Sequence, residues 1–137
     1  MWFSEIRKLV ESEQDRREGK FIEGVSLEEY FFKIKSNAEF FVHYSGSKCV
    51  GFVAFYCNDP KKEIAFISLI LISPEHRGQR VAESLMGCVL AALKARGFKS
   101  CQLEVRTSNF SALALYQRIG FSVFLEKENT VMMEKNV

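Results

Sequence analysis

The chain has 137 residues, 47% of them hydrophobic and 13% aromatic, so it is long enough for one packed domain, 1–137, and too apolar for a disordered segment. Its 19 basic and 17 acidic residues leave a formal net charge of +2, which argues against a nucleic-acid-binding surface. No apolar run approaches the ~20 residues of a membrane span, and the N-terminus lacks the pattern of a signal peptide. We therefore expect a cytoplasmic protein without nucleic-acid or membrane partners.

The four cysteines do not form a metal-binding or disulfide pattern. Cys49, Cys57, Cys88 and Cys101 include no Cys-x-x-Cys pair, and the chain contains only two histidines. Three of the cysteines fall in predicted strands and Cys88 falls in a predicted helix. We expect small buried or half-buried thiols and no bound metal.

The first third of the chain predicts two helices. Apolar residues recur at helical spacing from Trp2 to Val10 and predict a helix that ends near Arg16. Ser26, with Glu29 three residues later, forms a capping box that predicts the start of a second helix, which ends near Asn37.

Three strands are predicted next. Residues 40–44 and 48–56 flank a Ser-Gly-Ser turn and read as a hairpin, and a turn at 58–62 leads into the apolar strand Ile64–Ile72. An amphipathic helix then runs from about Gln79 to Arg96. Its predicted buried face consists of Val81, Ala82, Leu85, Met86, Val89, Leu90 and Leu93.

The last third predicts a strand, a helix and a hairpin. Apolar and polar residues alternate over Cys101–Arg106, the helix 109–119 ends at Gly120, and strands 121–127 and 130–135 follow. The order is α-α-β-β-β-α-β-α-β-β. This order predicts a mixed α/β (α+β) fold with one central sheet flanked by helices.

The segment between the apolar strand and the long helix has the features of a phosphate site. Basic residues follow Ser73, and the first N–H groups of a helix have no partner within the helix. The aligned peptide dipoles place partial positive charge at the same end. The backbone from Arg77 to Ala82 is therefore a candidate anion-binding loop.

Two motifs in the chain resemble those of the GCN5-related N-acetyltransferase (GNAT) superfamily. Residues 77–82, Arg-Gly-Gln-Arg-Val-Ala, are similar to its acyl-CoA loop, Gln/Arg-x-x-Gly-x-Gly/Ala, with Arg80 in place of the middle glycine. Residues 109–121 match its second motif, Asn-x-x-Ala-x-x-Leu-Tyr-x-x-x-Gly-Phe, at every named position. The resemblance covers roughly residues 39–135.

The resemblance implies a mostly antiparallel sheet in which two central strands separate at their C-terminal ends. Those strands would be Ile64–Ile72 and Cys101–Arg106. The family usually opens with a strand before its first helix. That strand is missing from this sequence, so we expect one edge of the sheet to be left open or covered by something else.

The resemblance also implies acetyl-CoA as cosubstrate, with no metal. Its pantetheine arm would pair with the backbone near Leu71 and Ile72, and Asn109 would cap its helix and reach the same arm. Its diphosphate would lie on the backbone N–H groups of the loop, which are those of Arg77, Gly78, Gln79, Arg80, Val81 and Ala82. Either the β-carbon of Arg80 obstructs this loop, or its guanidinium adds a phosphate contact.

Catalysis would need a proton donor for the thiolate and a base for the amine. Tyr116 occupies the family's donor position, although packing alone would also explain an aromatic residue there. The family's glutamate falls on Ser68, so Glu104 is the nearest candidate base, with Glu63 and His43 as lesser candidates. No cysteine stands at a nucleophile position, which favours direct transfer over a covalent acetyl-enzyme.

These features predict an N-acetyltransferase that transfers an acetyl group from acetyl-CoA to a primary amine. The alternative is a non-catalytic CoA-binding sensor or scaffold, which Arg80, Ser68 and the missing strand favour. The acceptor would be a small-molecule or peptide amine. It would be held by the first two helices, their connection at Gly19–Gly24 and the final hairpin. Candidate lining residues are Arg16, Arg17, Phe31 and Phe32, and a homodimer is compatible with the sequence.

Overall fold

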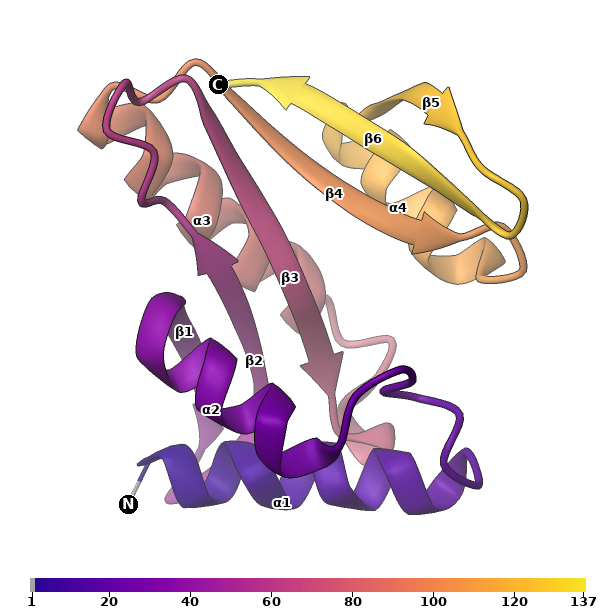
Figure 1. Ribbon diagram of the computed structural model, residues 1–137. Coiled ribbons are helices and arrows are strands. Elements are labelled where there is room, and N and C mark those ends of the chain that lie inside the picture. The colour runs from indigo at the N-terminus through magenta and orange to yellow at the C-terminus, as the bar shows by residue number, and fades with distance from the viewer. Residues whose placement is uncertain (1) are drawn as a thin grey trace.

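The computed structural model describes residues 2–137, which form one six-stranded sheet between helices (Figure 1). The α-helices are α1 (Trp2–Arg16), α2 (Leu27–Asn37), α3 (Val81–Arg96) and α4 (Phe110–Ile119), and a 3₁₀ helix covers Pro74–His76. The strands are β1 (Glu39–Ser45), β2 (Lys48–Tyr56), β3 (Ile64–Ile72), β4 (Ser100–Arg106), β5 (Ser122–Glu126) and β6 (Thr130–Asn136). No helix of this part of the chain is long and apolar enough to cross a membrane.

The sheet has the order β1-β2-β3-β4-β6-β5. Every neighbouring pair is antiparallel except β3 and β4, which are parallel. Parallel strands need a crossover connection, and α3 supplies it. The expectation of a mostly antiparallel mixed sheet is confirmed.

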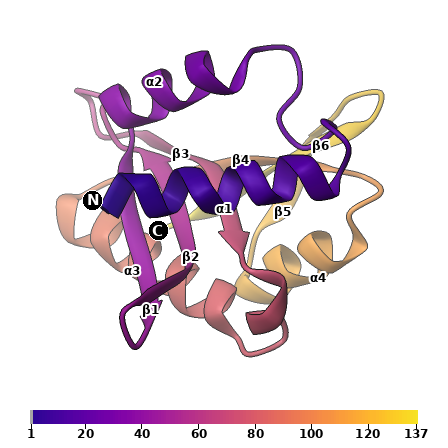
Figure 2. The same cartoon turned by 90° about the horizontal axis from the view of Figure 1, so that it is seen from below.

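Helices cover both faces of the sheet. Figure 2 shows α2 on one side of the sheet, α3 and α4 on the other, and α1 crossing the ends of β2 and β3. The core on the α3 side is built from Met86, Val89, Leu93, Cys101, Leu103 and Met133, among others. The core under α1 and α2 includes Phe3, Ile6, Val10, Phe31, Ile34 and Phe52. The apolar residues that recur at helical spacing in the sequence thus pack toward the sheet on both of its faces.

The two central strands pair only over their first halves. The residue pairs run from Ile64 with Ser100 to Ile67 with Leu103 and then stop. On the other side of β3, Ala54 pairs with Leu69 but Phe55 pairs with Ile67, so Ser68 is an extra residue without a partner on β2. Beyond this bulge β3 and β4 diverge (Figure 1). One edge of β3 is therefore open toward the gap between the strands.

Local signals set most element boundaries. The hydroxyl of Ser26 accepts a hydrogen bond from the N–H of Glu29 at 3.1 Å, which confirms the predicted cap of α2. Asn109 caps α4 by accepting from the N–H of Ala112 at 3.2 Å, and Gly120 ends that helix with φ 118°. The strand Ile64–Ile72 has the predicted bounds.

The structure differs from the sequence-based predictions at the start of α3 and at Cys88. The long helix begins at Val81 and not near Gln79, because Arg80 adopts a left-handed backbone conformation with φ 62° and ψ 21°. Cys88 is exposed, since it lies on the solvent side of α3. Among residues 2–137 no strand precedes α1, and β1 forms one edge of the sheet.

Candidate functional site

The loop before α3 presents free backbone donors. The N–H groups of Gly78 through Ala82 make no hydrogen bond within residues 2–137, and those of Val81 and Ala82 lie at the positive end of the α3 dipole. Gly78 and Arg80 have φ values of 82° and 62°, so the loop turns twice through the left-handed region. A run of unpartnered donors at a helix start is suited to a phosphate group.

A cavity of about 690 Å³ lies beside this loop. The loop and the start of α3 form one wall, and α4 contributes Ser111, Leu115 and Arg118. Arg80 has 85% of its side chain exposed, and its nearest acidic partner, Glu83, is 3.9 Å away. The Arg80 guanidinium is therefore free to reach an anion in this cavity.

Arg77 is held differently from Arg80. Its Nε donates to the carbonyl of Ile72 at 3.0 Å, and its Nη2 donates to Oε1 of Glu13 at 3.0 Å. Its own N–H bonds weakly to the carbonyl of Pro74 at 3.4 Å. The Arg77 side chain thus fastens the start of the loop to β3 and α1, and the donors available to a ligand begin at Gly78.

A second hollow, a cleft of about 280 Å³, lies where β3 and β4 separate. It is lined by Arg17, Phe21, Ile22, Tyr30, Ile67, Ser68, Leu69, Ile70, Leu71, Leu103, Glu104, Val105, Arg106, Asn109, Ala112 and Tyr116. The loop cavity is lined by the next residue of β3, Ile72, and by other residues of α4, so the two hollows lie next to each other along β3 and α4. The structure therefore brings the predicted residues Leu71, Glu104, Asn109 and Tyr116 to one cleft, and Ile72 and the loop to the neighbouring cavity.

Tyr116 is the buried residue of α4 and has 7% of its surface exposed. Its ring packs edge-on against Phe121 with centroids 6.1 Å apart. Burial alone raises the pKa of Tyr116 to about 12, and no hydrogen bond from residues 2–137 adds to or opposes this shift. A phenol of this kind remains protonated at neutral pH and has its proton available for a ligand.

A cluster of hydroxyl groups surrounds the bulge of β3. Ser68 lies close to the hydroxyls of Tyr30 and Tyr56; burial raises the pKa of Tyr30 to about 12 and also raises that of Tyr56, and Ser68 partly opposes both shifts. The Tyr56 hydroxyl is buried and has no partner at hydrogen-bonding geometry in the described chain. Buried hydroxyls normally have a partner, so this group has the capacity to hold a water or a ligand atom. Sequence reasoning missed both tyrosines, because the bulge that turns Ser68 toward them leaves no sequence signal.

Glu104 lies in the cleft, as expected, but its carboxylate is engaged. It accepts from the hydroxyl of Thr130 at 2.6 Å and from Nζ of Lys127 at 3.3 Å. Thr130 is the main cause that holds the pKa of Glu104 below its ordinary value. Among the lining residues it is the one carboxylate, although its lowered pKa weakens it as a base.

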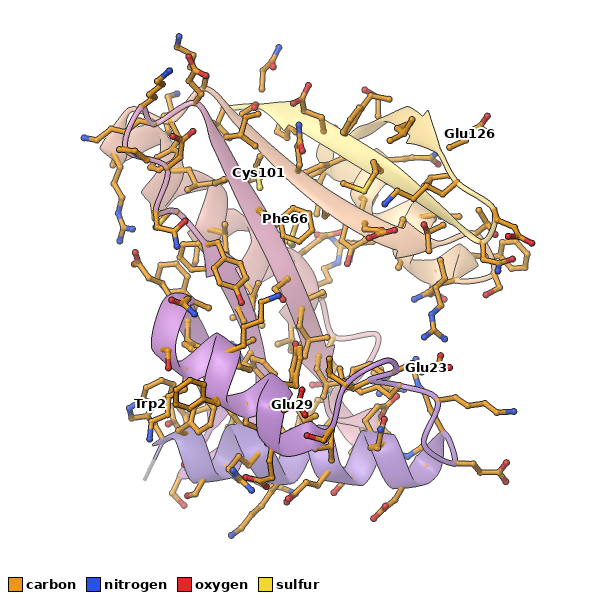
Figure 3. All side chains as sticks on the ribbon, in the orientation of Figure 1. Trp2, Glu23, Glu29, Phe66, Cys101 and Glu126 are labelled. Carbon is orange, nitrogen blue, oxygen red and sulfur yellow. The ribbon has the colours of Figure 1, made fainter. Side chains whose placement is uncertain are left out.

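The connection between α1 and α2 covers the open end of the cleft. Arg106, at the end of β4, donates to the carbonyl of Lys20 at 3.2 Å and to Oε1 of Glu23 at 2.6 Å. Figure 3 shows Glu23 in this connection, below the end of β4. Gln14 accepts from the N–H groups of Phe21 and Ile22 at 3.0 and 2.8 Å. The connection is thereby fixed from both sides of the cleft.

Several candidate residues lie elsewhere. Phe31 is buried against α1, and Phe32, with 76% of its surface exposed, lies beside Phe31 in a different surface hollow. Arg16 lines a cavity between α1 and the ends of β2 and β3. Glu63 and His43 do not line the cleft, because Glu63 precedes β3 and His43 lies on the edge strand β1. Of the four proposed acceptor-lining residues, only Arg17 reaches the cleft.

Comparison with known proteins gives this geometry a family. The chain matches the acetyltransferase (GNAT) family over residues 5–121. An uncharacterised N-acetyltransferase of Methanocaldococcus jannaschii is 37% identical over 93 residues, which are 65% of this chain and 40% of that protein. The N-alpha-acetyltransferase MAK3 of Arabidopsis thaliana is 30% identical over 82 residues, which are 59% of this chain and 43% of that protein. The chain therefore spans about two fifths of the length of these curated relatives.

A solved structure shares the fold. The PaiA N-acetyltransferase of Thermoplasma acidophilum, in complex with coenzyme A, superimposes with a TM-score of 0.77 at 18% identity, covering 98% of this chain and 92% of that one. The arrangement of helices around a splayed sheet is thus that of known acetyltransferase structures.

Proposed function

Because the chain belongs to the GNAT acetyltransferase family, we propose that residues 1–137 act as one acetyltransferase domain that transfers an acetyl group from acetyl-CoA to a primary amine. The observation that carries this proposal is that two hollows lie next to each other along β3 and α4, where neighbouring residues of each element line one or the other. One is bordered by unpartnered backbone donors and the other contains a protonated, buried tyrosine. Together they suit a phosphate-bearing thioester whose reacting end lies at Tyr116.

The donor fits the chemistry of both hollows. The diphosphate would accept hydrogen bonds from the backbone from Gly78 to Ala82, and Arg80 would add a charge-assisted contact. The pantetheine amides would pair with the open edge of β3 near Leu71, where β4 has already diverged. The solved PaiA relative binds coenzyme A, which supports the same ligand here.

The reaction would proceed by direct attack. The neutral amine forms a bond to the thioester carbonyl carbon, and the carbon–sulfur bond then breaks. Tyr116 donates its proton to the departing sulfur, which leaves as a thiol. The proton lost by the amine is accepted within the cleft.

Two groups compete for that proton. Glu104 is the one carboxylate among the cleft-lining residues, and because its lowered pKa makes it a weak base, it would act on an amine that is already largely neutral. A water bound by Ser68, Tyr30 and the unpartnered hydroxyl of Tyr56 is the second group. We propose Glu104 as the base, and substitution of each group decides between them.

The acceptor would enter under the connection between α1 and α2. Phe21, Ile22 and Tyr30 give this side of the cleft an apolar surface with a polar tip. The Arabidopsis relative is an N-alpha-acetyltransferase, which favours the α-amine of a peptide over a small-molecule amine. A cytoplasmic location and a homodimer stay predictions from the sequence.

A non-catalytic CoA-binding module is the second candidate, and Arg80 and Ser68 favour it because both replace residues typical of active relatives. The deciding experiment measures thiol release from acetyl-CoA with a panel of peptides and small amines. Acetyl transfer to any of them, lost in Tyr116→Phe, supports the enzyme. CoA binding without turnover on the whole panel supports the sensor, and absence of CoA binding contradicts both.

A further inference from the structure

Glu13 of α1 is a buried carboxylate that the proposed chemistry does not use. Its side chain is 2% exposed, yet it lies one turn from the end of an otherwise amphipathic helix. A buried carboxylate is costly unless charged partners surround it. Glu13 has three: Arg16 and Arg17 follow it closely in the chain, and Arg77 comes from the loop before α3.

Each partner arrives at a defined oxygen. Oε1 accepts from Nη2 of Arg77 at 3.0 Å and from Nη1 of Arg16, and Oε2 accepts from Nε of Arg17 at 2.7 Å. Both oxygens thus accept hydrogen bonds from guanidinium groups. The arrangement is a fixed junction, since moving one arginine would leave the carboxylate under-compensated.

Arg77 connects this junction to the loop proposed to bind the phosphates of CoA. It is the first residue of the phosphate loop, and its Nε also holds the carbonyl of Ile72, the last residue of β3. Glu13 therefore fixes the orientation of the side chain from which the loop starts. The loop's free donors follow directly, beginning at Gly78.

Arg17 connects the same junction to the acceptor side. Its guanidinium lies over the ring of Phe21, 4.8 Å from the ring centroid. Phe21 and Arg17 both line the cleft, and the N–H of Phe21 is held by Gln14 on α1. The covering connection and the phosphate loop thus meet at one carboxylate.

We infer that Glu13 is a positioning residue that couples the two substrate sites, so that ordering of the phosphate loop by CoA also orders the connection over the acceptor cleft. The inference rests on the proposed use of CoA as donor. It requires no contact between Glu13 and either substrate. Coupling of this kind is reciprocal, because a ligand that favours one arrangement of the junction favours it for both sites.

The test compares Glu13→Gln with Glu11→Gln, an exposed glutamate on the same helix that lies 3.8 Å from Arg7. CoA binding is measured by calorimetry, and hydrogen exchange of residues 17–24 is measured with and without saturating CoA. We expect the CoA dissociation constant of Glu13→Gln to rise about tenfold, as loss of a charged hydrogen-bond partner would cause. CoA should slow exchange in residues 17–24 of the wild type and Glu11→Gln, but not of Glu13→Gln.

If Glu13→Gln binds CoA as the wild type does and shows the same slowing, the inference is wrong while the proposed function stands. If the wild type binds no CoA, both fail. Should Glu13→Gln not fold, Arg17→Gln takes its place, because it leaves the bond between Glu13 and Arg77 intact. We then expect the slowing in residues 17–24 to disappear with a smaller change in CoA affinity, and retained slowing overturns the inference.

Discussion

Arg118 of α4 donates through Nε to Oε1 of Glu83 at 2.8 Å, which joins α4 to the first turn of α3. Its Nη2 donates to the same oxygen, and Arg80 lies 3.9 Å from the other carboxylate oxygen. Arg118 is the main cause that holds the pKa of Glu83 below its ordinary value, so Glu83 is a fixed negative charge beside the phosphate loop. It limits the positive potential that a CoA phosphate would meet.

Glu83→Gln is therefore expected to tighten CoA binding by a few-fold at low salt, since it removes a repulsive charge and frees two guanidinium groups. The gain should shrink as salt screens the charges. Calorimetric titration at two salt concentrations measures it. Equal or weaker binding by the variant at low salt would show that the pair matters for positioning α4 more than for charge.

Tyr116→Phe is expected to lower turnover by about 10²-fold or more and to leave CoA affinity nearly unchanged, because it removes a proton donor and keeps the packed ring. Steady-state kinetics and calorimetry check the two halves. Phe121→Leu is the matched control, since it alters the ring contact but keeps the hydroxyl. Turnover of Tyr116→Phe within a factor of two of the wild type would mean that the tyrosine only packs.

The raised pKa of Tyr116 also determines how protein stability changes with pH. The folded protein holds this proton up to about pH 12, whereas an unfolded tyrosine releases it near pH 10. Stability from this group is complete below pH 10 and is lost as pH rises from about 10 to 12. Denaturant melts across this range should show the wild type losing stability relative to Tyr116→Phe, which has no group that titrates there. A difference between the two proteins that stays constant with pH would contradict the shift.

Arg80→Gly separates backbone strain from charge. Its φ of 62° is unfavourable by about 1–2 kcal/mol for a residue with a β-carbon, and glycine's entropy offsets about 0.5–1 kcal/mol of that relief. We expect a slightly more stable protein that binds CoA more weakly at low salt, with a smaller difference at high salt and for dephospho-CoA. Tighter binding by the variant at both salts would mean that the side chain obstructs the loop.

Glu104→Gln is expected to lower kcat/KM by about tenfold, below the usual range for a base because its pKa is already lowered. Ser68→Ala and Tyr56→Phe are the comparison variants. A larger loss in these two than in Glu104→Gln would assign the amine's proton to a water at the hydroxyl cluster.

The sequence predicts the elements that have local causes. The capping box at Ser26, the asparagine cap at Asn109 and the unbroken apolar strand Ile64–Ile72 each lie within a few residues of the structure they produce. The start of α3 is wrong by two residues, since a left-handed arginine overrides the helical pattern at Gln79. Propensity does not anticipate that conformation at a residue with a β-carbon.

The sequence predicts those parts of the candidate site that lie within a motif, but not those that distant residues form together. Tyr116 and the loop are found by motif, but Tyr30 and Tyr56 meet Ser68 only because β3 carries an extra residue there. The junction of Glu13 with Arg77 spans 64 positions in the chain. No pattern within one element reveals a contact between residues so distant in sequence.

The divergence of β3 and β4 divides one end of the sheet into two separate halves. Four residue pairs, from Ile64 with Ser100 to Ile67 with Leu103, join the two halves. One half consists of β1, β2 and β3, and the other consists of β4, β6 and β5. Two ion pairs cross the gap at its open end, one between Arg106 and Glu23 and one between Arg118 and Glu83. These two ion pairs bridge the sides of the cleft, so we expect removal of either one to widen the cleft and to admit bulkier acyl chains.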